Sequence, residues 1–242
     1  MESEAIMKDI KKRYDGIKKR AKASAINSGR NPDEIKIIAV SKTHPVKELE
    51  CAYKAGLRCF GENYVQELTD KNDIFHDKGI SGFEWHFIGH LQSNKVRFIA
   101  PFVHFIHSVD SFKLADEISK RAIQNERNIN ILIQINTSGE SSKSGCEPDD
   151  AIQLIEKILE LKNINVIGLM TIGTFTDDET IQRREFSLLR NTLIEVNSQL
   201  GTNLKELSMG MTGDFEVAIN EGATMVRVGT AIFGDRIYKN FG

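Results

Sequence analysis

The sequence predicts an α/β protein, a single (β/α)8 barrel of the TIM type with an extra helix at its N-terminus. After Pro32, eight short apolar or β-branched runs alternate with longer helical segments, which is typical of βα units and a parallel sheet. Eight such units in about 210 residues would give a compact barrel near the lower end of that fold's usual size. A doubly wound open sheet is the alternative.

The first thirty residues are expected to form an amphipathic helix. Apolar side chains recur there at spacings of three and four, at Ile6, Ile10, Tyr14, Ile17 and Ala21. Nine Lys or Arg against four Asp or Glu cover the remaining surface. Because the only aromatic residue here, Tyr14, belongs to the apolar stripe and is not available for base stacking among the basic residues, we interpret the helix as packing its apolar stripe on the barrel, with polyanion binding as the alternative.

The eight runs are the predicted strands, and several are apolar throughout, as expected where both faces are covered. They span residues 36–41, 58–61, 84–89, 104–109, 130–136, 165–172, 205–210 and 224–230. The main predicted helices between them span 45–55, 111–126, 148–161 and 177–200. No linker-like composition interrupts this alternation, so we expect one domain over residues 1–242, with its helix at 1–30 and its barrel at 35–236.

Composition excludes several classes of partner and site. Lys plus Arg at 32 against Asp plus Glu at 34 leaves a net charge of -2, so nucleic acid and anionic membranes are not expected partners. No stretch is long and apolar enough for a membrane helix or a signal peptide, which predicts a cytoplasmic protein. His86 and His90, like His104 and His107, lack an accompanying H-E-x-x-H or C-x-x-C, and no metal site is expected.

Lys42 is the first candidate functional residue. It follows the first predicted strand, in AVSKTHP, and the active face of such a barrel lies at the carboxyl ends of its strands. A lysine beside apolar walls loses stabilisation of its charge, so its amine becomes more available as a nucleophile toward a carbonyl carbon. A surface lysine extending from a strand end is the structural alternative.

The loops after the last two predicted strands are rich in small residues. They span 208–213 and 229–234, and their glycines let backbone N–H groups approach an anion, while Ser208 and Thr230 add hydroxyl donors. In barrels of this type these loops often bind phosphate, although simple helix capping would also explain either loop alone. Together with Lys42, they indicate a ligand with a phosphate and an aldehyde, which fits pyridoxal 5'-phosphate.

Arg227 precedes Gly229 by two positions in the eighth predicted strand, so both residues are expected on the inward face. An inward arginine needs an acceptor, and the pyridine nitrogen of the cofactor would serve. Because arginine keeps its proton, that nitrogen would stay unprotonated and the ring would be a poorer electron sink. This favours a racemase-like or non-catalytic role over decarboxylation. The structural alternative for Arg227 is a buried salt bridge to a carboxylate at a strand end.

Seven segments, in this order, resemble the pyridoxal phosphate homeostasis protein family. They are AVSKTHP, FGENYVQE, WHFIGHLQSNK, LIQINTSGESSKSG, GLMTIG, LSMGMTGDFEVAI and MVRVGTAIFG, and they extend from about Ile35 to Arg236. The resemblance implies a barrel similar to the N-terminal domain of alanine racemases, with the cofactor in a Schiff base with Lys42. Thr212 stands where the family usually has serine, and His90 stands where many relatives have proline.

The same resemblance implies the remaining cofactor contacts. Asn63 would line the cofactor, Arg227 would face the ring nitrogen, and Ser208, Gly229 and Thr230 would surround the phosphate. Lys143, in SSKSG, would be a second lysine near the pocket that takes the cofactor for transfer.

Three classes of function remain open: a carrier of pyridoxal phosphate, a racemase or lyase that uses it, and a barrel for another phosphorylated ligand. Racemases of this fold carry a second, β-rich domain that supplies a catalytic tyrosine, whereas this chain ends at Gly242 shortly after the eighth predicted strand. Water would then reach the bound cofactor. We therefore expect a monomer or weak dimer that holds and delivers pyridoxal phosphate to apoenzymes, without strong catalysis of its own.

Overall fold

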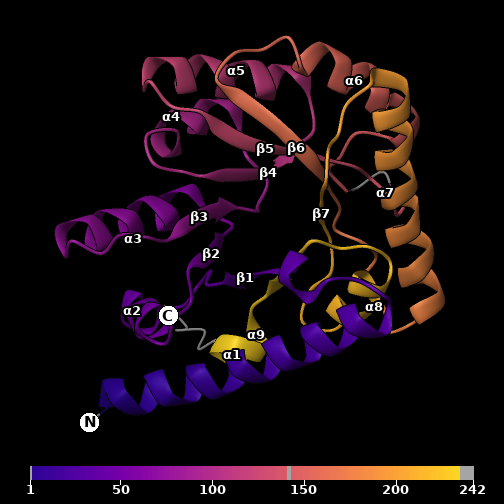
Figure 1. The fold of residues 1–242 in the computed structure, drawn as a ribbon. Coiled ribbons are helices and arrows are strands. Elements are labelled where there is room, and N and C mark those ends of the chain that lie inside the picture. The colour runs from indigo at the N-terminus through magenta and orange to yellow at the C-terminus, as the bar shows by residue number, and fades with distance from the viewer. Residues whose placement is uncertain (1, 141–142, 235–242) are drawn as a thin grey trace.

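A computed structural model describes residues 2–140 and 143–234. The expected end of the barrel at Arg236, and both ends of the predicted domain, lie outside these ranges. Eight parallel strands form a closed barrel in which each strand pairs with the next and the last pairs with the first (Figure 1). The predicted barrel is confirmed, and the alternative of an open sheet is wrong.

All eight predicted strands are present, although most are shorter than the apolar runs. The strands are β1 (Lys36–Val40), β2 (Cys59–Glu62), β3 (Glu84–Phe87), β4 (Phe105–Val109), β5 (Ile129–Gln134), β6 (Ile164–Met170), β7 (Glu206–Ser208) and β8 (Met225–Val228). The difference lies mainly at the carboxyl ends, where the last residues of several runs leave the ladder and form the loops that surround the functional site.

Helices follow the strands around the outside of the barrel. They are α2 (Val46–Lys54), α3 (Val65–Asp77), α4 (Val96–Ile99), α5 (Phe112–Gln124), α6 (Ala151–Ile158), α7 (Glu179–Leu200), α8 (Phe215–Asn220) and α9 (Thr230–Phe233). Short 3-10 turns span Pro32–Glu34, Ser93–Lys95 and Pro148–Asp150. The last of these explains why α6 begins three residues later than predicted, since Pro148 opens a tighter turn before the helix.

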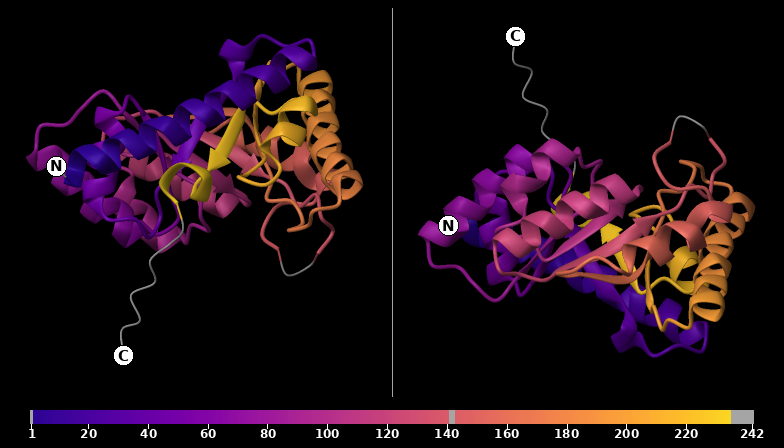
Figure 2. Two further views of the ribbon diagram at one scale, coloured as in Figure 1. Left: turned by 90° about the horizontal axis from the view of Figure 1, so that it is seen from below. Right: turned by 90° about the horizontal axis from the view of Figure 1, so that it is seen from above.

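The N-terminal helix α1 (Glu2–Asn27) lies across α2, α8 and α9 (Figures 1 and 2). It buries Ile10, Ile17 and Ala21, so the predicted apolar stripe packs on the barrel. One of its basic residues, Arg20, pairs with Glu216 of α8 at 2.6 Å. No helix in the described ranges is long and apolar enough to cross a membrane.

The barrel interior has an apolar layer and a polar layer. The apolar cluster comprises Ile38, Phe105, Leu132, Met170 and Met225. His107 lies two residues after Phe105 on β4, and Arg227 lies two residues after Met225 on β8, so each pair shares the inward face. The polar layer therefore lies nearer the carboxyl ends of the strands than the apolar layer does.

Candidate functional site

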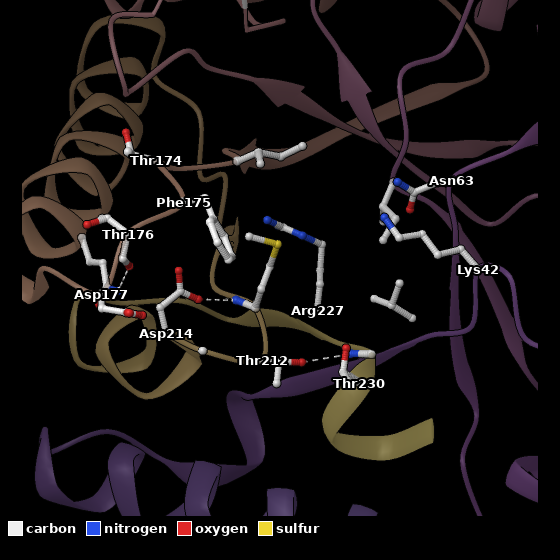
Figure 3. A pocket seen from close by; sticks show the side chains of 17 residues that line it. Lys42, Asn63, Thr174, Phe175, Thr176, Asp177, Thr212, Asp214, Arg227 and Thr230 are labelled. Atoms are coloured by element: carbon white, nitrogen blue, oxygen red, sulfur yellow. Dashed lines mark hydrogen bonds between the residues drawn. The ribbon is translucent and has the colours of Figure 1, made fainter. Parts of the chain in front are cut away.

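A cavity of about 360 Å³ opens at the carboxyl ends of the strands (Figure 3). Its walls come from Val40 of β1 and Arg227 of β8, from the loops that follow β1, β2, β3, β6, β7 and β8, and from Gln182 of α7. This is the face on which barrels of this type carry their active sites. Lys42 and Asn63 lie together on one side of the cavity, with Arg227 at its centre and Thr212 and Thr230 below it (Figure 3).

Five of the seven predicted cofactor residues line this cavity: Lys42, Asn63, Arg227, Gly229 and Thr230. Ser208 and Lys143 do not line it. Ser208 is fully buried, and its hydroxyl contacts His107 and Arg227 inside the barrel. Lys143 pairs with Glu140 at 2.6 Å and contacts the carbonyl oxygen of Gly173 at 3.3 Å, next to the wall residues Ile172 and Thr174.

The backbone on both sides of Lys42 is held by the neighbouring βα unit. The ammonium of Lys71, on α3, donates to the carbonyl oxygen of Ser41 at 2.8 Å, and the N–H of Thr43 donates to Glu67, also on α3, at 2.6 Å. Thr43 has a φ of 67°, which β-branched residues rarely adopt. The bond to Glu67 stabilises this conformation, which fixes the turn that presents Lys42.

A buried ion pair lies beneath this turn. Lys71 bridges Glu62 at 2.7 Å and Glu67 at 2.8 Å, and the hydroxyl of Ser41 donates to Glu62 at 2.6 Å. Glu62 is fully buried, and this burial raises its pKa to about 7, although Lys71 and Ser41 oppose the shift. Glu62, in the segment FGENYVQE, is therefore a structural partner of the turn that carries Lys42 and not an exposed base.

Asn63 is pressed against the next loop of the barrel. Its Oδ1 atom is buried and has no hydrogen-bond partner in the part of the chain that the structure describes. Its backbone lies against Gly89, where a Cβ atom would come within 2.2 Å of the Asn63 carbonyl oxygen. A buried carbonyl oxygen without a donor is unfavourable, so this atom is suited to accept a hydrogen bond from a ligand in the cavity.

Arg227 enters the cavity from inside the barrel. Its guanidinium donates to the Ser208 hydroxyl at 2.7 Å and to the Thr171 carbonyl oxygen at 2.8 Å, so both of these acceptors are neutral. Burial lowers the pKa of Arg227 to about 10, while the charge of Asp214 acts in the opposite direction. The group therefore stays cationic at neutral pH.

The floor of the cavity is made by the loops after β7 and β8. The hydroxyl of Thr212 accepts from the N–H of Gly229 at 3.3 Å, a long bond that a competing acceptor could replace (Figure 3). The first N–H groups of α9, which begins at Thr230, have no partner within the helix. A Cβ on Gly229, which follows β8, would lie 3.2 Å from the Val40 carbonyl oxygen at the end of β1, a tight contact that a larger residue would relieve only by a small shift.

Comparison with known proteins assigns the family. Residues 19–237 match the alanine racemase N-terminal domain. Pyridoxal phosphate homeostasis proteins of Pseudomonas aeruginosa and Aquifex aeolicus are 44% and 42% identical to this chain, over 219 and 226 residues. These alignments cover 90% and 93% of this chain, and 92% and 98% of those proteins. This chain belongs to the pyridoxal phosphate homeostasis protein family.

A solved structure of a similar protein has the same architecture. PipY of Synechococcus elongatus, solved with PLP bound, is 33% identical to this chain and superposes with a TM-score of 0.81. The match covers 93% of this chain and 100% of PipY. The resemblance inferred from the seven sequence segments is confirmed.

Several residues of this family member that shape the site escaped the sequence analysis. Lys71 and Glu67 lie one turn apart on α3, a pattern that also describes any solvated helix face. In the sequence Thr212 stands out only as a departure from serine, yet it lines the cavity and Ser208 does not. His86 and His107 contact each other at 3.0 Å, a pairing that their distance in the sequence conceals.

Proposed function

We propose that this protein binds pyridoxal 5'-phosphate in the cavity and holds it for delivery to other proteins. One observation carries the proposal: the amine of Lys42, the cationic guanidinium of Arg227 and Asn63 Oδ1, which has no hydrogen-bond partner among the described residues, converge on one cavity beside the loops after β7 and β8. The relatives named for pyridoxal phosphate homeostasis, and PipY with PLP bound, support this proposal.

The residues present fit this cofactor. When bound, pyridoxal phosphate supplies an aldehyde that condenses with a primary amine and releases water, and Lys42 provides that amine. Arg227 would donate to the ring nitrogen and keep it unprotonated. Asn63 Oδ1 would accept a hydrogen bond from the ligand. Thr212, Gly229 and Thr230 would hold the phosphate through hydroxyl and backbone N–H donors.

Ser208 and Lys143 take different parts in the proposal. The hydroxyl of Ser208 already contacts Arg227 and His107, so Ser208 would act on the cofactor through Arg227. Thr212, which lines the cavity, would supply in its place the hydroxyl that binds the phosphate group. Lys143 contacts the segment that forms the cavity wall. Its role as a second amine that takes the cofactor during transfer stays a prediction.

The cavity mouth favours carriage over catalysis. Phe175 lines the cavity, yet 99% of its surface is exposed, so this side of the mouth is open to solvent. Efficient carbanion chemistry needs a site that excludes water. We therefore infer a role without strong catalytic activity, exercised in the cytoplasm by a monomer or weak dimer, with pyridoxal phosphate-dependent apoenzymes as recipients. A racemase or lyase that uses the same cofactor is the alternative.

The test is to incubate the purified protein with pyridoxal phosphate, record its absorption spectrum, reduce it with borohydride and locate the pyridoxyl group by peptide mass spectrometry. We expect a yellow protein with the pyridoxyl group on Lys42. A protein that stays colourless and unlabelled in excess cofactor would refute the proposal. Transfer to an apoenzyme, with little turnover of a panel of amino acids, would separate a carrier from a racemase or lyase.

A further inference from the structure

A chain of hydrogen bonds runs through the barrel from the cavity toward the opposite end. The Arg227 guanidinium contacts Ser208 Oγ at 2.7 Å, and Ser208 Oγ contacts His107 Nδ1 at 2.9 Å. His107 Nε2 then contacts His86 Nδ1 at 3.0 Å, and His86 Nε2 contacts Glu84 Oε2 at 3.4 Å. Arg227, Ser208 and both histidines are buried, whereas Glu84, the first residue of β3, is partly exposed.

The protons of this chain can be assigned from its arginine end. Arginine only donates, so Ser208 Oγ accepts from Arg227. The single hydroxyl proton of Ser208 is then available for His107 Nδ1, the other contact that the structure gives for this oxygen. His107 Nδ1 therefore accepts, and in a neutral ring the proton must reside on Nε2.

The same reasoning carries through the second histidine to Glu84. His107 Nε2–H donates to His86 Nδ1, so the proton of a neutral His86 resides on its Nε2 and points at Glu84. Burial lowers the pKa of His86 to about 4 and that of His107 well below its usual value, so both rings are neutral at neutral pH. Each ring thus has one donor and one acceptor, as the chain requires.

Glu84 provides the acceptor that ends the chain. Its carboxylate also accepts from Lys36 at 2.8 Å and from the Cys59 thiol at 3.4 Å. The bond from His86 and the ammonium of Lys36 hold the pKa of Glu84 at about 2, so it is ionised. Arg227, which only donates hydrogen bonds, is therefore at one end of the chain, and the Glu84 carboxylate, which only accepts them, is at the other. Every hydrogen bond between them is donated in the direction of Glu84.

A metal ion would require the opposite proton arrangement. Cys59, Glu84 and His86 present ligand atoms within 4.8 Å of one another, a combination that suits a transition metal by residue type. A metal would take the lone pair of His86 Nε2 and move its proton to Nδ1. Ser208 Oγ would then accept hydrogen bonds from both Arg227 and His107, and neither of these two residues would accept the hydroxyl proton of Ser208. Lys36, already bound to Glu84, would also repel the ion.

We propose that Ser208, His107, His86 and Glu84 are positioning residues for Arg227, joined in a one-way hydrogen-bond chain that balances the guanidinium charge from the far end of the barrel. The contacts of Arg227 within the barrel are neutral oxygens, so its cationic face remains directed to the cavity. Its part at the cofactor ring rests on the proposed function, whereas the proton arrangement is a property of the protein alone.

The proton arrangement is tested first, on the cofactor-free full chain labelled with 15N-histidine. Two-bond 1H–15N correlation spectra show which ring nitrogen carries the proton, and His86→Asn and His107→Asn assign the signals. We expect both rings as neutral Nε2–H tautomers between pH 6 and 8. An Nδ1–H tautomer or an imidazolium at either ring would overturn the proposal, as would a shift of the His86 signals on adding equimolar Zn²⁺.

The coupling to the cavity is tested with three variants loaded with pyridoxal phosphate. Ser208→Ala removes an acceptor of a charged donor and is expected to weaken cofactor binding about tenfold. Glu84→Gln should weaken it in the same direction and shift the pH profile of the bound cofactor's absorption. Glu34→Gln, in the turn before β1, is the control that changes neither.

Equal cofactor affinity and equal absorption profiles for Glu84→Gln and the wild type would overturn the coupling. If the hydrogen-bond chain served stability alone, Ser208→Ala and Glu84→Gln would change only the midpoint of unfolding. If the wild-type protein failed to take up pyridoxal phosphate at all, the proposed function would fail, while the NMR spectra would still decide the proton arrangement.

Discussion

Gly89 and Asn63 are in such close contact that no side chain fits between them. A Cβ atom on Gly89 would lie 2.2 Å from the carbonyl oxygen of Asn63 and 2.7 Å from its Cα atom. Gly89 follows β3 and Asn63 follows β2, so this contact fixes two neighbouring loops at the mouth of the barrel. The position of the Asn63 amide in the cavity depends on it.

Gly89→Ala is expected to displace the Asn63 loop. The clash is with backbone, which cannot move aside as a flexible side chain would, so we expect a loss of about 3 kcal/mol in the free energy of unfolding. Urea denaturation measures this loss, and pyridoxal phosphate titration should show weaker binding. Gly16→Ala is the matched control, because nothing lies within 4 Å of its Cβ position on α1. It should stabilise the protein by about 0.5 kcal/mol.

Lys42→Ala is expected to abolish the borohydride-stable pyridoxyl adduct and leave the barrel folded. Lys42 is only half-buried, so the free energy of unfolding should change by no more than about 0.5 kcal/mol. Lys143→Ala is the comparison, since Lys143 lies outside the cavity wall. It should retain the adduct at full occupancy, and mass spectrometry distinguishes the two. A full adduct in Lys42→Ala would show that another amine is the partner.

The sequence predicted the barrel because each strand is a local pattern. A short apolar run covered on both faces is readable without knowing its partners, and eight of them in alternation with helices specify the architecture. The positions of Lys42, Asn63, Arg227 and Gly229 at the cavity follow from the same rule, because the carboxyl ends of parallel strands and the residues after them meet at one end of the barrel.

The features that could not be predicted from the sequence depend on where a strand ends and on contacts between residues far apart in the chain. Ser208 and Thr212 occur in the same motif, and only the end of β7 at Ser208 decides that the first points into the barrel and the second into the cavity. His86 and His107 are brought together by the pairing of β3 with β4. His90 and His104, which lie near them in the sequence, are not members of this hydrogen-bond chain.

Lys71→Met should show how strongly the turn that carries Lys42 depends on the buried ion pair. The variant leaves Glu62 buried without its cation, for which we expect a loss of about 3 kcal/mol in the free energy of unfolding. Because a protonated Glu62 is less costly to bury, the loss should be larger at pH 8 than at pH 6. Urea denaturation at the two pH values measures this difference.

Two further variants isolate the cause. Adding Glu62→Gln to Lys71→Met should recover part of the lost stability, because the stranded charge is removed. Lys78→Met is the control, since Lys78 follows the same helix but pairs with Glu50 at an exposed site, and it should cost less than about 0.5 kcal/mol. Equal losses in Lys71→Met and Lys78→Met would contradict a structural role for the buried pair.

The buried histidine His86 predicts a specific loss of stability in acid. Its pKa is about 4 in the folded protein against 6.5 for an ordinary histidine, so between these values the unfolded chain binds a proton that the folded chain does not. Stability is therefore lost as pH falls from about 6.5 toward 4, by about 2 kcal/mol at pH 4.5. His107, whose pKa is also lowered, acts in the same direction.

Glu62 acts in the opposite direction over part of this range. Its pKa is raised to about 7, so the folded chain binds the extra proton between pH 7 and 4.5, and stability rises there as pH falls. The slope of the wild-type free energy of unfolding against pH combines the contributions of His86 and Glu62. The difference between the wild type and a variant without His86 separates them. Since His86→Asn lacks the titrating ring, its free energy of unfolding should approach that of the wild type as pH falls from 7 to 4.5. A His86→Asn curve that instead stayed parallel to the wild-type curve would mean that His86 takes up its proton over the same pH range in the folded and the unfolded chain.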